Sequence, residues 1–483
     1  MPAGSQGELL ARAVGLAATL MVAACADLAP PYQRPVLPVP EQYADAAATP
    51  DDALSVSVCW PEYVVDAQLR ALISEALANN RDLRVALSRV EEARASYGIQ
   101  RAEAVPLVSA NLIGSRTSIP AELNPLGRGM IGNQFVAGAD LNGWELDFWG
   151  RVRNLETSAL ESYLASDAAA RAARLSLITQ VGDGYLALSE LDERLALARR
   201  TLASRARSLQ VFRRREQTGS ASRLELTQVE LLWRQAAMLT TTLAQQRDVQ
   251  AHELAMLVGD QQRQFATTAP GPERATFREL QPGLPSDLLN SRPDVIAAEH
   301  GLKAATASIG AARAAYFPRI ALTALVGTAS PELDGLFRNG SAAWTVSPAV
   351  ALPVLDGGRR SAAVDVARAR QQTALESYQR TVQAAFRDVS NALSARRWLA
   401  DQADTLSAML ALQTERSRLA GLRYESGAVG YLEVLDAERE LLAAEQQLVQ
   451  VRRALLGAQL ALWSALGGGP MGAPGHAPPP CNE

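Results

Sequence analysis

Residues 422–442 read LRYESGAVGYLEVLDAERELL, and residues 214–234 read RREQTGSASRLELTQVELLWR. In both stretches an arginine stands four positions before a glycine, and a Leu-Glu pair follows that glycine after four further residues. One constant offset in numbering carries Gly219 onto Gly427, and the same offset relates glycines far outside these stretches. Long repeated units of this kind predict one architecture that is built twice and packed on itself.

Proline is absent from residues 126–269 and from residues 354–469. Because an interior proline removes a hydrogen bond and breaks a helix, these two runs permit unusually long helices. Apolar residues recur in them at three- and four-residue spacing, which predicts amphipathic helices over about 151–217, 222–258, 360–424 and a last helix ending near Leu466. The first helix would be roughly 100 Å long, and its apolar stripe needs partner helices, as in coiled coils.

Four short segments alternate apolar residues with small or polar ones, the two-residue period of β-strands. They lie at residues 107–115, 133–148, 319–328 and 342–356. Each is long enough to hold a strand of about ten residues, close to the ~9–11 residues of a tilted membrane-spanning strand. Loops rich in Gly, Asn and Pro join them in pairs, so the sequence predicts two β-hairpins. A helical pattern that starts at about Asp66 precedes the first hairpin and ends before Pro106.

The N-terminal residues have the composition of a targeting segment. Arg12 precedes an apolar stretch, residues 13–24, which is too short to span a bilayer. The sequence VAAC, ending at Cys25, resembles a bacterial lipobox, in which the cysteine thiol takes a diacylglycerol and becomes the new N-terminus. The alternative is an ordinary signal peptide with an incidental cysteine. Cys59 and Cys481 either pair in an oxidising compartment or both stay free.

Composition and motifs exclude several classes of protein. The formal net charge is −4 and there is no basic run, so no nucleic-acid partner is expected. The three histidines, His252, His300 and His476, show no ligand spacing, and the chain has no phosphate-binding loop or nucleophile elbow. We therefore expect no enzyme, no metal site and no cofactor apart from a covalent lipid on Cys25.

Three longer stretches carry a family resemblance: WELDFWGRVR at residues 144–153, RPDVIAAEHGLKAATASIGAARAAYFPRI at 292–320, and LRYESGAVGYLEVLDAERELL at 422–442. Together they resemble the TolC-like outer-membrane efflux channels over nearly the whole mature chain. The lipobox and the segment PPYQRPVLPVP after it are similar to the NodT-type lipoprotein branch that serves resistance-nodulation-division (RND) pumps. One departure is Cys59-Trp60, where relatives often carry two tryptophans.

The resemblance implies a mostly α fold with transmembrane β-strands, in which a β-hairpin and a pair of long antiparallel coiled-coil helices occur twice. Three copies would form one shared twelve-stranded β-barrel and one α-helical tunnel. Four strands leave two open edges, which lipid does not tolerate, so closure by more than one chain is also expected on physical grounds. The expected divisions are a lipoprotein signal peptide (1–24), a lipid-anchored Pro-rich segment (25–63), a first efflux repeat (64–282), a second efflux repeat (283–469) and a disordered Gly/Pro-rich tail (470–483).

The turn at Gly427 is the best candidate for a functional site. Leu432 and Asp436 are spaced i, i+4 and so share one helix face. The resemblance implies that this turn is the periplasmic tip of the channel, where helices converge and close the tunnel. The candidate gate residues are Leu432 and Asp436 at constriction rings, Glu433 at an acidic ring position, Arg439 beside them, and Tyr424 as a tie between neighbouring hairpins.

A simpler reading of these residues is helix capping. The helix dipole favours acidic residues in a first turn, and glycines suit any tight turn. The first copy helps to discriminate, because Gln228 stands where Asp436 stands in the second. An extra carboxylate on only one of two matched turns suggests a purpose beyond capping.

Trp144, Phe148 and Trp149 form a cluster where the strand pattern gives way to a helix. Amphipathic aromatic rings concentrate at membrane interfaces. The cluster therefore either anchors the barrel at the inner lipid interface or packs beneath it.

We predict a lipid-anchored channel in the outer membrane of a Gram-negative bacterium, extending into the periplasm as the exit duct of a tripartite efflux pump. It would conduct small molecules passively. The expected partners are two further copies in a homotrimer, a periplasmic adaptor, an inner-membrane RND transporter and outer-membrane lipid. The alternatives are the outer-membrane duct of a type I protein secretion system and, more distantly, a periplasmic adaptor or coiled-coil scaffold lipoprotein, which should carry one helical hairpin rather than two.

Overall fold

The computed structural model describes residues 27–36, 39–40, 58–125, 127–266, 276–280 and 288–469. The predicted signal peptide, the lipobox Cys25 and the predicted tail with Cys481 lie outside the described residues. Cys59 is described and takes part in a disulfide bond. The chain divides into two compact units, called here the first unit (residues 1–36, 89–166 and 297–378) and the second unit (residues 37–88, 167–296 and 379–483).

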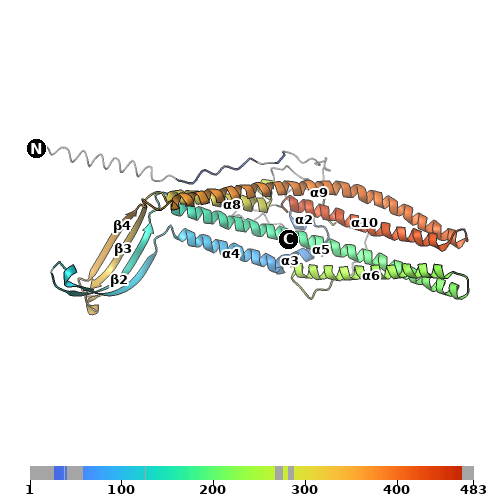
Figure 1. The fold of residues 1–483 in the computed structure, drawn as a ribbon, viewed down its shortest axis with the longest axis horizontal. Coiled ribbons are helices and arrows are strands. Elements are labelled where there is room, and N and C mark those ends of the chain that lie inside the picture. The colour runs from blue at the N-terminus through green and yellow to red at the C-terminus, as the bar shows by residue number, and fades with distance from the viewer. Residues whose placement is uncertain are drawn as a thin grey trace. The chain divides into compact units, whose positions relative to one another are not determined.

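The first unit contains a four-stranded antiparallel sheet with the strand order β1-β2-β3-β4 (Figure 1). The strands are β1 (Val108–Ile119), β2 (Met130–Glu145), β3 (Arg319–Ser330) and β4 (Ala342–Ala351). All four predicted strands and both hairpins are confirmed, and the pairing of β2 with β3 joins the two copies. β4 ends at Ala351, earlier than predicted, where its pairing partner β3 begins at Arg319. Short 3-10 turns, η1 (Ala121–Leu123) and η3 (Leu333–Gly335), lie in the hairpin loops.

The register of the strands gives the sheet one mainly apolar face and one face that is richer in polar residues, since alternate residues point to opposite sides. The apolar face includes the paired positions Leu112–Ala137, Val326–Trp344 and Ala324–Val346. The polar face includes the paired positions Ser109–Asp140, Ser115–Gln134 and Thr323–Ser347. Leu112 is 69% exposed and Trp344 is 75% exposed, so in the described part of one chain the apolar face is left open to its surroundings.

The two hairpins approach each other closely at Gly138 of β2 and Gly327 of β3, which are directly paired. A Cβ atom added to Gly138 would lie 2.9 Å from the Cα of Gly327. Backbone cannot move aside as a flexible side chain can, so glycine is required where the two copies join.

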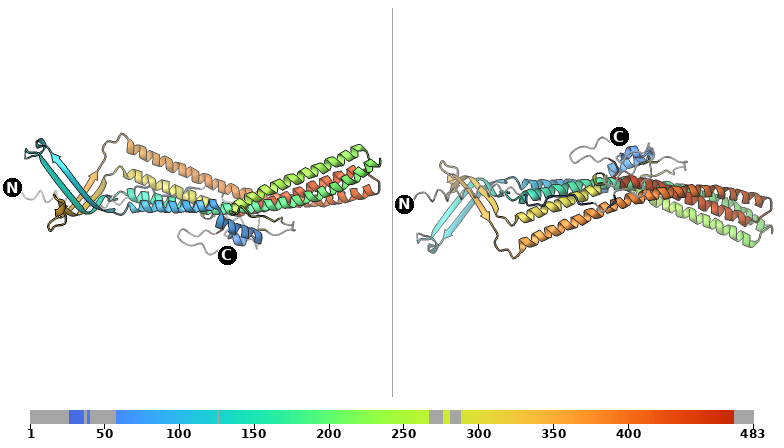
Figure 2. Two further views of the ribbon diagram at one scale, coloured as in Figure 1. Left: turned by 90° about the horizontal axis from the view of Figure 1, so that it is seen from below. Right: turned by 90° about the horizontal axis from the view of Figure 1, so that it is seen from above.

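Four long helices have the predicted limits to within one residue: α5 (Arg151–Gln217), α6 (Arg223–Val258), α9 (Arg359–Glu425) and α10 (Tyr431–Ala465). In the second unit, α5 and α6 run side by side as one antiparallel pair, and α9 and α10 as another (Figures 1 and 2). The pairs meet along α5 and α10, where Arg205 lies 2.8 Å from Glu438 and the Nε of Arg194 donates to Gln446 at 2.7 Å. The helix order is therefore α6–α5–α10–α9.

The single helical pattern predicted before Pro106 is wrong in one respect, because two helices, α3 (Ala67–Asn79) and α4 (Arg81–Ala102), fill it. Asn80 between them has extended backbone, with φ −60° and ψ 130°. Its side chain accepts from the N–H of Leu83 at 2.9 Å and donates to the carbonyl of Leu257 on α6 at 2.9 Å. An asparagine that caps the next helix in this way competes with continuation of the first one.

The core of the second unit forms around Trp463 of α10, which is 1% exposed. Its ring stacks on Tyr63 at 5.5 Å, and its Nε1–H donates to the carbonyl of Val58 at 3.1 Å. Tyr63 belongs to the short helix α2 (Trp60–Tyr63), and its other ring neighbour is Phe277 at 5.1 Å. Two further helices complete the described chain, α7 (Leu288–Ser291) and α8 (Pro293–Ala314). Among the helices of the described residues, none combines the length and the apolar character needed to cross a membrane.

Candidate functional site

The turn between α9 and α10 reverses the chain at Gly427, whose φ of +79° is one that side-chain-bearing residues rarely adopt. The N–H of Gly427 donates to the carbonyl of Tyr424 at 2.9 Å, and the N–H of Ala428 donates to that of Arg423 at 2.9 Å. These two bonds satisfy carbonyls that the end of α9 would otherwise leave unpaired. The glycine therefore fixes where α9 stops and where the first turn of α10 begins.

The N-termini of α6 and α10 are capped differently. Ser222 begins α6 with a full capping box: its Oγ accepts from the N–H of Glu225 at 3.2 Å, and Glu225 accepts from the N–H of Ser222 at 2.7 Å. At α10 the N-cap is Gly430, without a side-chain cap. Glu433 instead accepts from the Arg423 guanidinium at 2.7 Å. Capping thus accounts for the carboxylate of Glu225 in the first copy, but not for that of its counterpart Glu433 in the second.

Leu432 and Asp436 lie on the exposed side of α10, while the apolar residues Val434, Leu435 and Ala437 are buried. Leu432 is 53% exposed, and the side chain of Asp436 is 42% exposed. Leu435 and Ala437 are buried in apolar clusters at the tip of the hairpins. The pair therefore faces away from the packed core of its own chain.

Asp436 is held by two arginines. Arg416, on α9, donates to one carboxylate oxygen at 2.6 Å, and Arg439, one turn further along α10, donates to the other at 2.6 Å. Arg439 also contacts Glu440 at 3.0 Å. The sequence analysis missed Arg416. The signal available was that Arg416 and Asp436 stand almost equally far from Gly427 on opposite arms of an antiparallel hairpin.

Tyr424 connects the two helix pairs at their tips, where its hydroxyl accepts a hydrogen bond from Arg215 of α5. The Arg215 guanidinium also lies 5.8 Å from the centre of the Tyr424 ring. Tyr431, at the start of α10, packs on Tyr424 at 4.9 Å and bonds Ser208 of α5 through its hydroxyl. The sequence indicated Arg215 as the repeat counterpart of Arg423, but not as a residue of the site.

The aromatic residues at the end of β2 lie in two different environments. Trp149 is packed: its Nε1–H donates to the carbonyl of Pro318 at 2.7 Å and its ring stacks on Phe317 at 4.7 Å. Trp144 and Phe148 line a cavity of about 470 Å³ together with side chains of Glu156 and other residues. The Nε1–H of Trp144 donates to the carbonyl of Ala104 at 3.3 Å.

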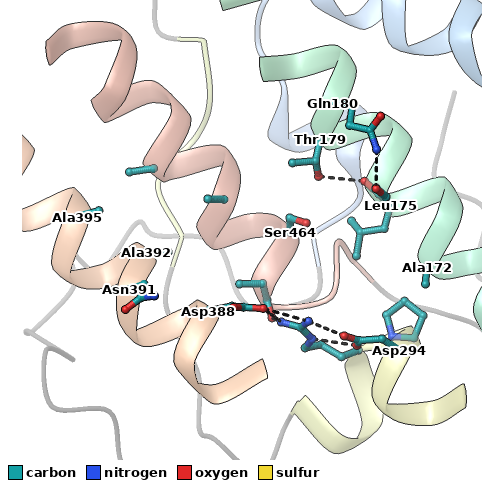
Figure 3. Close-up of a pocket in the computed structure, with 16 residues that line it drawn as sticks. Ala172, Leu175, Thr179, Gln180, Asp294, Asp388, Asn391, Ala392, Ala395 and Ser464 are labelled. Carbon is teal, nitrogen blue, oxygen red and sulfur yellow. Dashed lines mark hydrogen bonds and ion pairs between the residues drawn. The ribbon is translucent and has the colours of Figure 1, made fainter. Parts of the chain in front are cut away.

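A second cavity, of about 550 Å³, lies in the second unit between α5, α9, α10 and the start of α8 (Figure 3). Small side chains such as Ala172, Ala392 and Ala395 line much of it. At one end Arg292 contacts Asp294 at 2.6 Å and Asp388 at 3.5 Å, and it donates to the carbonyl of Ala465 at 3.1 Å. A cation at the C-terminal end of α10 is favoured by the helix dipole. The network therefore joins the end of α10 and the start of α8 to the middle of α9.

Comparisons with known proteins match this chain almost from end to end. The family model described as "Outer membrane efflux protein" matches residues 72–260 and 284–468. The outer membrane protein OprJ of Pseudomonas aeruginosa is 40% identical over 93% of this chain and 94% of its own length. The solvent efflux pump outer membrane protein SrpC of Pseudomonas putida is 38% identical over 94% and 97%. The open state of the Neisseria gonorrhoeae MtrE outer membrane channel superposes with a TM-score of 0.81 at 35% identity, over 92% of this chain and 98% of that one.

Proposed function

The chain belongs to the outer membrane efflux protein family, and we propose that it is the exit duct through which a tripartite pump releases small molecules from the cell. Its relatives include an efflux component for solvents, and its fold is that of outer-membrane channels. Conduction through this component is passive in the proposal, with energy supplied elsewhere in the pump, and the protein has no enzymatic role. The division into two efflux repeats, 64–282 and 283–469, belongs to the same proposal.

The observation that carries the proposal is the two-faced sheet. A strand set with one apolar and one polar face suits a wall between lipid and a water-filled lumen. Within the described residues, β1 and β4 are edge strands, each paired on one side only. Open edges are not tolerated in lipid, so the sheet needs strands from further copies to close it as a barrel.

The helices of the second unit support the same oligomer. α6 and α9 are the two outermost helices in the order α6–α5–α10–α9, and both carry exposed apolar side chains. These are Leu231, Met238, Val249 and Met256 on α6, and Trp398, Met409 and Leu412 on α9. At 3.6 residues per turn, the four residues of α6 fall within roughly 20° of one another. We propose that this α6 stripe packs on α9 of the next copy, a head-to-tail contact that closes into a ring. Three copies is the number that the family resemblance implies.

Further partners follow from the same role. We propose that the chain works with a periplasmic adaptor and an inner-membrane RND transporter. Leu432, Asp436, Glu433, Arg439 and Tyr424 are proposed as the gate residues at the periplasmic tip. The exposed position of Leu432 and Asp436 beside the turn supports this role, and so does the pairing of Glu433 with Arg423 in place of a cap. Trp144, Phe148 and Trp149 are proposed as the aromatic residues at the base of the barrel. The cavity beside Trp144 and Phe148 supports an interface role for these two, and the contact of Trp149 with Pro318 supports packing for the third.

Channel activity is tested directly by purifying the protein and inserting it into planar lipid bilayers. We expect stable conductance steps in salt solution, and a deletion strain that becomes more susceptible to exported compounds. Complementation with the intact gene should restore the resistance. Purified oligomer that inserts without conducting would contradict the proposed function.

Arg416→Ala should make the channel more cation-selective. Asp436 faces two guanidinium groups at 2.6 Å each, so its carboxylate is neutralised while both are present. Removing one of them leaves a more negative constriction, which attracts cations. The measurement is the reversal potential under a salt gradient. Arg418→Ala is the matched control, because this exposed α9 arginine pairs with Glu415 at 2.7 Å instead; equal shifts in the two variants would contradict the prediction.

Cys25 is proposed to carry the lipid that anchors the N-terminus. Mass spectrometry of the mature protein should find an N-terminal diacylglyceryl Cys25, and Cys25→Ala behind a cleavable signal should still insert, because one anchor adds little beside a barrel. Since Cys59 is in a disulfide bond, digestion without reduction provides a control. A peptide linking Cys25 to Cys59, or a mature chain that starts elsewhere, would contradict lipidation.

A further inference from the structure

The Pro-rich segment that follows the lipobox is in contact with the helices of the first unit. Residues 27–36, called here the strap, have neither helical nor strand structure. Near the start of the strap, Asn154 of α5 donates to the Asp27 carboxylate at 2.9 Å, and Arg313 of α8 donates to the carbonyl of Leu28 at 3.1 Å. Next to them Ala29 lies against Gly310, where an added Cβ would come within 2.8 Å of the Ala29 methyl.

The other end of the strap is held by one carboxylate, Glu299 of α8. Its side chain is only 8% exposed. Tyr32 donates its hydroxyl hydrogen to one oxygen at 3.1 Å, and Arg34 donates to the other at 2.6 Å. Lys303, the only lysine in the chain, lies one helical turn away at 3.2 Å and also sits over the Tyr32 ring at 5.2 Å. Two contacts from the strap and one from α8 therefore converge on this buried group.

We propose that Glu299 is a positioning residue that locks the strap onto the first unit and so limits how far the N-terminal anchor can move. Asp27 is the second residue after Cys25 in the sequence. Two extended residues reach at most about 7 Å, so a strap fixed at Asp27 ties any group on Cys25 to this part of the fold. The proposal concerns the strap alone and stands whether or not the protein conducts.

The balance of forces on Glu299 favours a locked strap. Burial by itself would raise the pKa of the carboxyl, yet the hydrogen bond from Arg34 and the charge of Lys303 hold that pKa below its usual value. A buried carboxylate is costly unless it is paired. When the strap detaches, Glu299 loses Tyr32 and Arg34 together and keeps Lys303, so detachment is opposed by a charge-assisted bond as well as a neutral one.

Cleavage after Tyr32 can report whether the strap is attached to the first unit. Chymotrypsin cleaves after exposed tyrosines, and the Tyr32–Gln33 bond is protected while Tyr32 is held on Glu299. In the full oligomer in detergent, Glu299→Ala should speed cleavage at this bond about tenfold or more, the size expected when a charge-assisted hydrogen bond is removed. Mass spectrometry of the fragment ending at Tyr32 gives the rate. Glu299→Gln, which keeps the shape and one acceptor, should fall between wild type and Glu299→Ala.

Two comparisons separate a locking role from general damage to the fold. Glu376→Ala removes an exposed α9 carboxylate of the first unit that bonds Gln372 at 2.7 Å, and it should leave the cleavage rate unchanged. Arg34→Ala should raise the rate, and combining it with Glu299→Ala should add little further, because both remove the same contact. Wild-type protection in Glu299→Ala, or faster cleavage that comes only with loss of the oligomer, would overturn the proposal.

Discussion

Replacing Leu432 and Asp436 together by alanine is expected to raise the single-channel conductance at least about twofold in planar bilayers. Leu432 is 53% exposed on the same side of α10 as Asp436, whereas the neighbouring Val434, Leu435 and Ala437 are buried. In a ring of identical copies this side would point several leucines and several salt-bridged aspartates into one constriction. Removing both side chains widens the opening and frees Arg416 and Arg439 from the carboxylate that now holds them.

The matched control lies in the other hairpin. Gln228 is the repeat counterpart of Asp436 and stands in the first turns of α6, so Gln228→Ala should change conductance much less. Block by divalent cations should also weaken in the double variant, because the Asp436 carboxylate of each copy is gone. If the double variant conducts like the wild type while Gln228→Ala does not, the constriction lies on the α5–α6 hairpin.

Placing a charge in the middle of the α6 stripe should prevent assembly. Met238 is 70% exposed and Leu231 is 57% exposed in the single chain. An interface that buries both gains about 25 cal/mol for each Å² of apolar surface removed from water, and a buried unpaired carboxylate reverses that gain. Leu231→Glu combined with Met238→Glu should therefore abolish the oligomer in native mass spectrometry in detergent.

The other outer helix, α9, offers an independent check of the proposed contact between copies. Leu412 of α9 is 72% exposed, and Leu412→Glu should weaken the oligomer in the same way if α9 receives the α6 stripe. Arg70→Glu reverses a charge on α3, which carries no such stripe in the described chain, and should leave the oligomer intact. A well-folded, monodisperse wild-type monomer would refute the shared architecture altogether.

Much of the fold can be predicted from the sequence because its signals are local. Two proline-free runs with helical periodicity gave the four long helices to within one residue, and two-residue alternation gave the four strands. The glycine of each helix turn, Gly219 or Gly427, marked where the chain reverses. Glycine adopts a positive φ readily because it has no Cβ, whatever its surroundings. The error at Asn80 has the opposite origin, because the asparagine breaks the helix partly through a bond to Leu257, which is far along the chain.

The sequence by itself determined the duplicated architecture, the limits of its four long helices, and the turn that holds the candidate gate. Only the tertiary structure decided which charges meet there: Arg416 on Asp436, Arg423 on Glu433 and Arg215 on Tyr424. It also decided that the strap ends on Glu299. Periodicity records which residues share a face of one element. The pairing between elements depends on how the helices are set against one another, and that register comes from the packing of the whole chain.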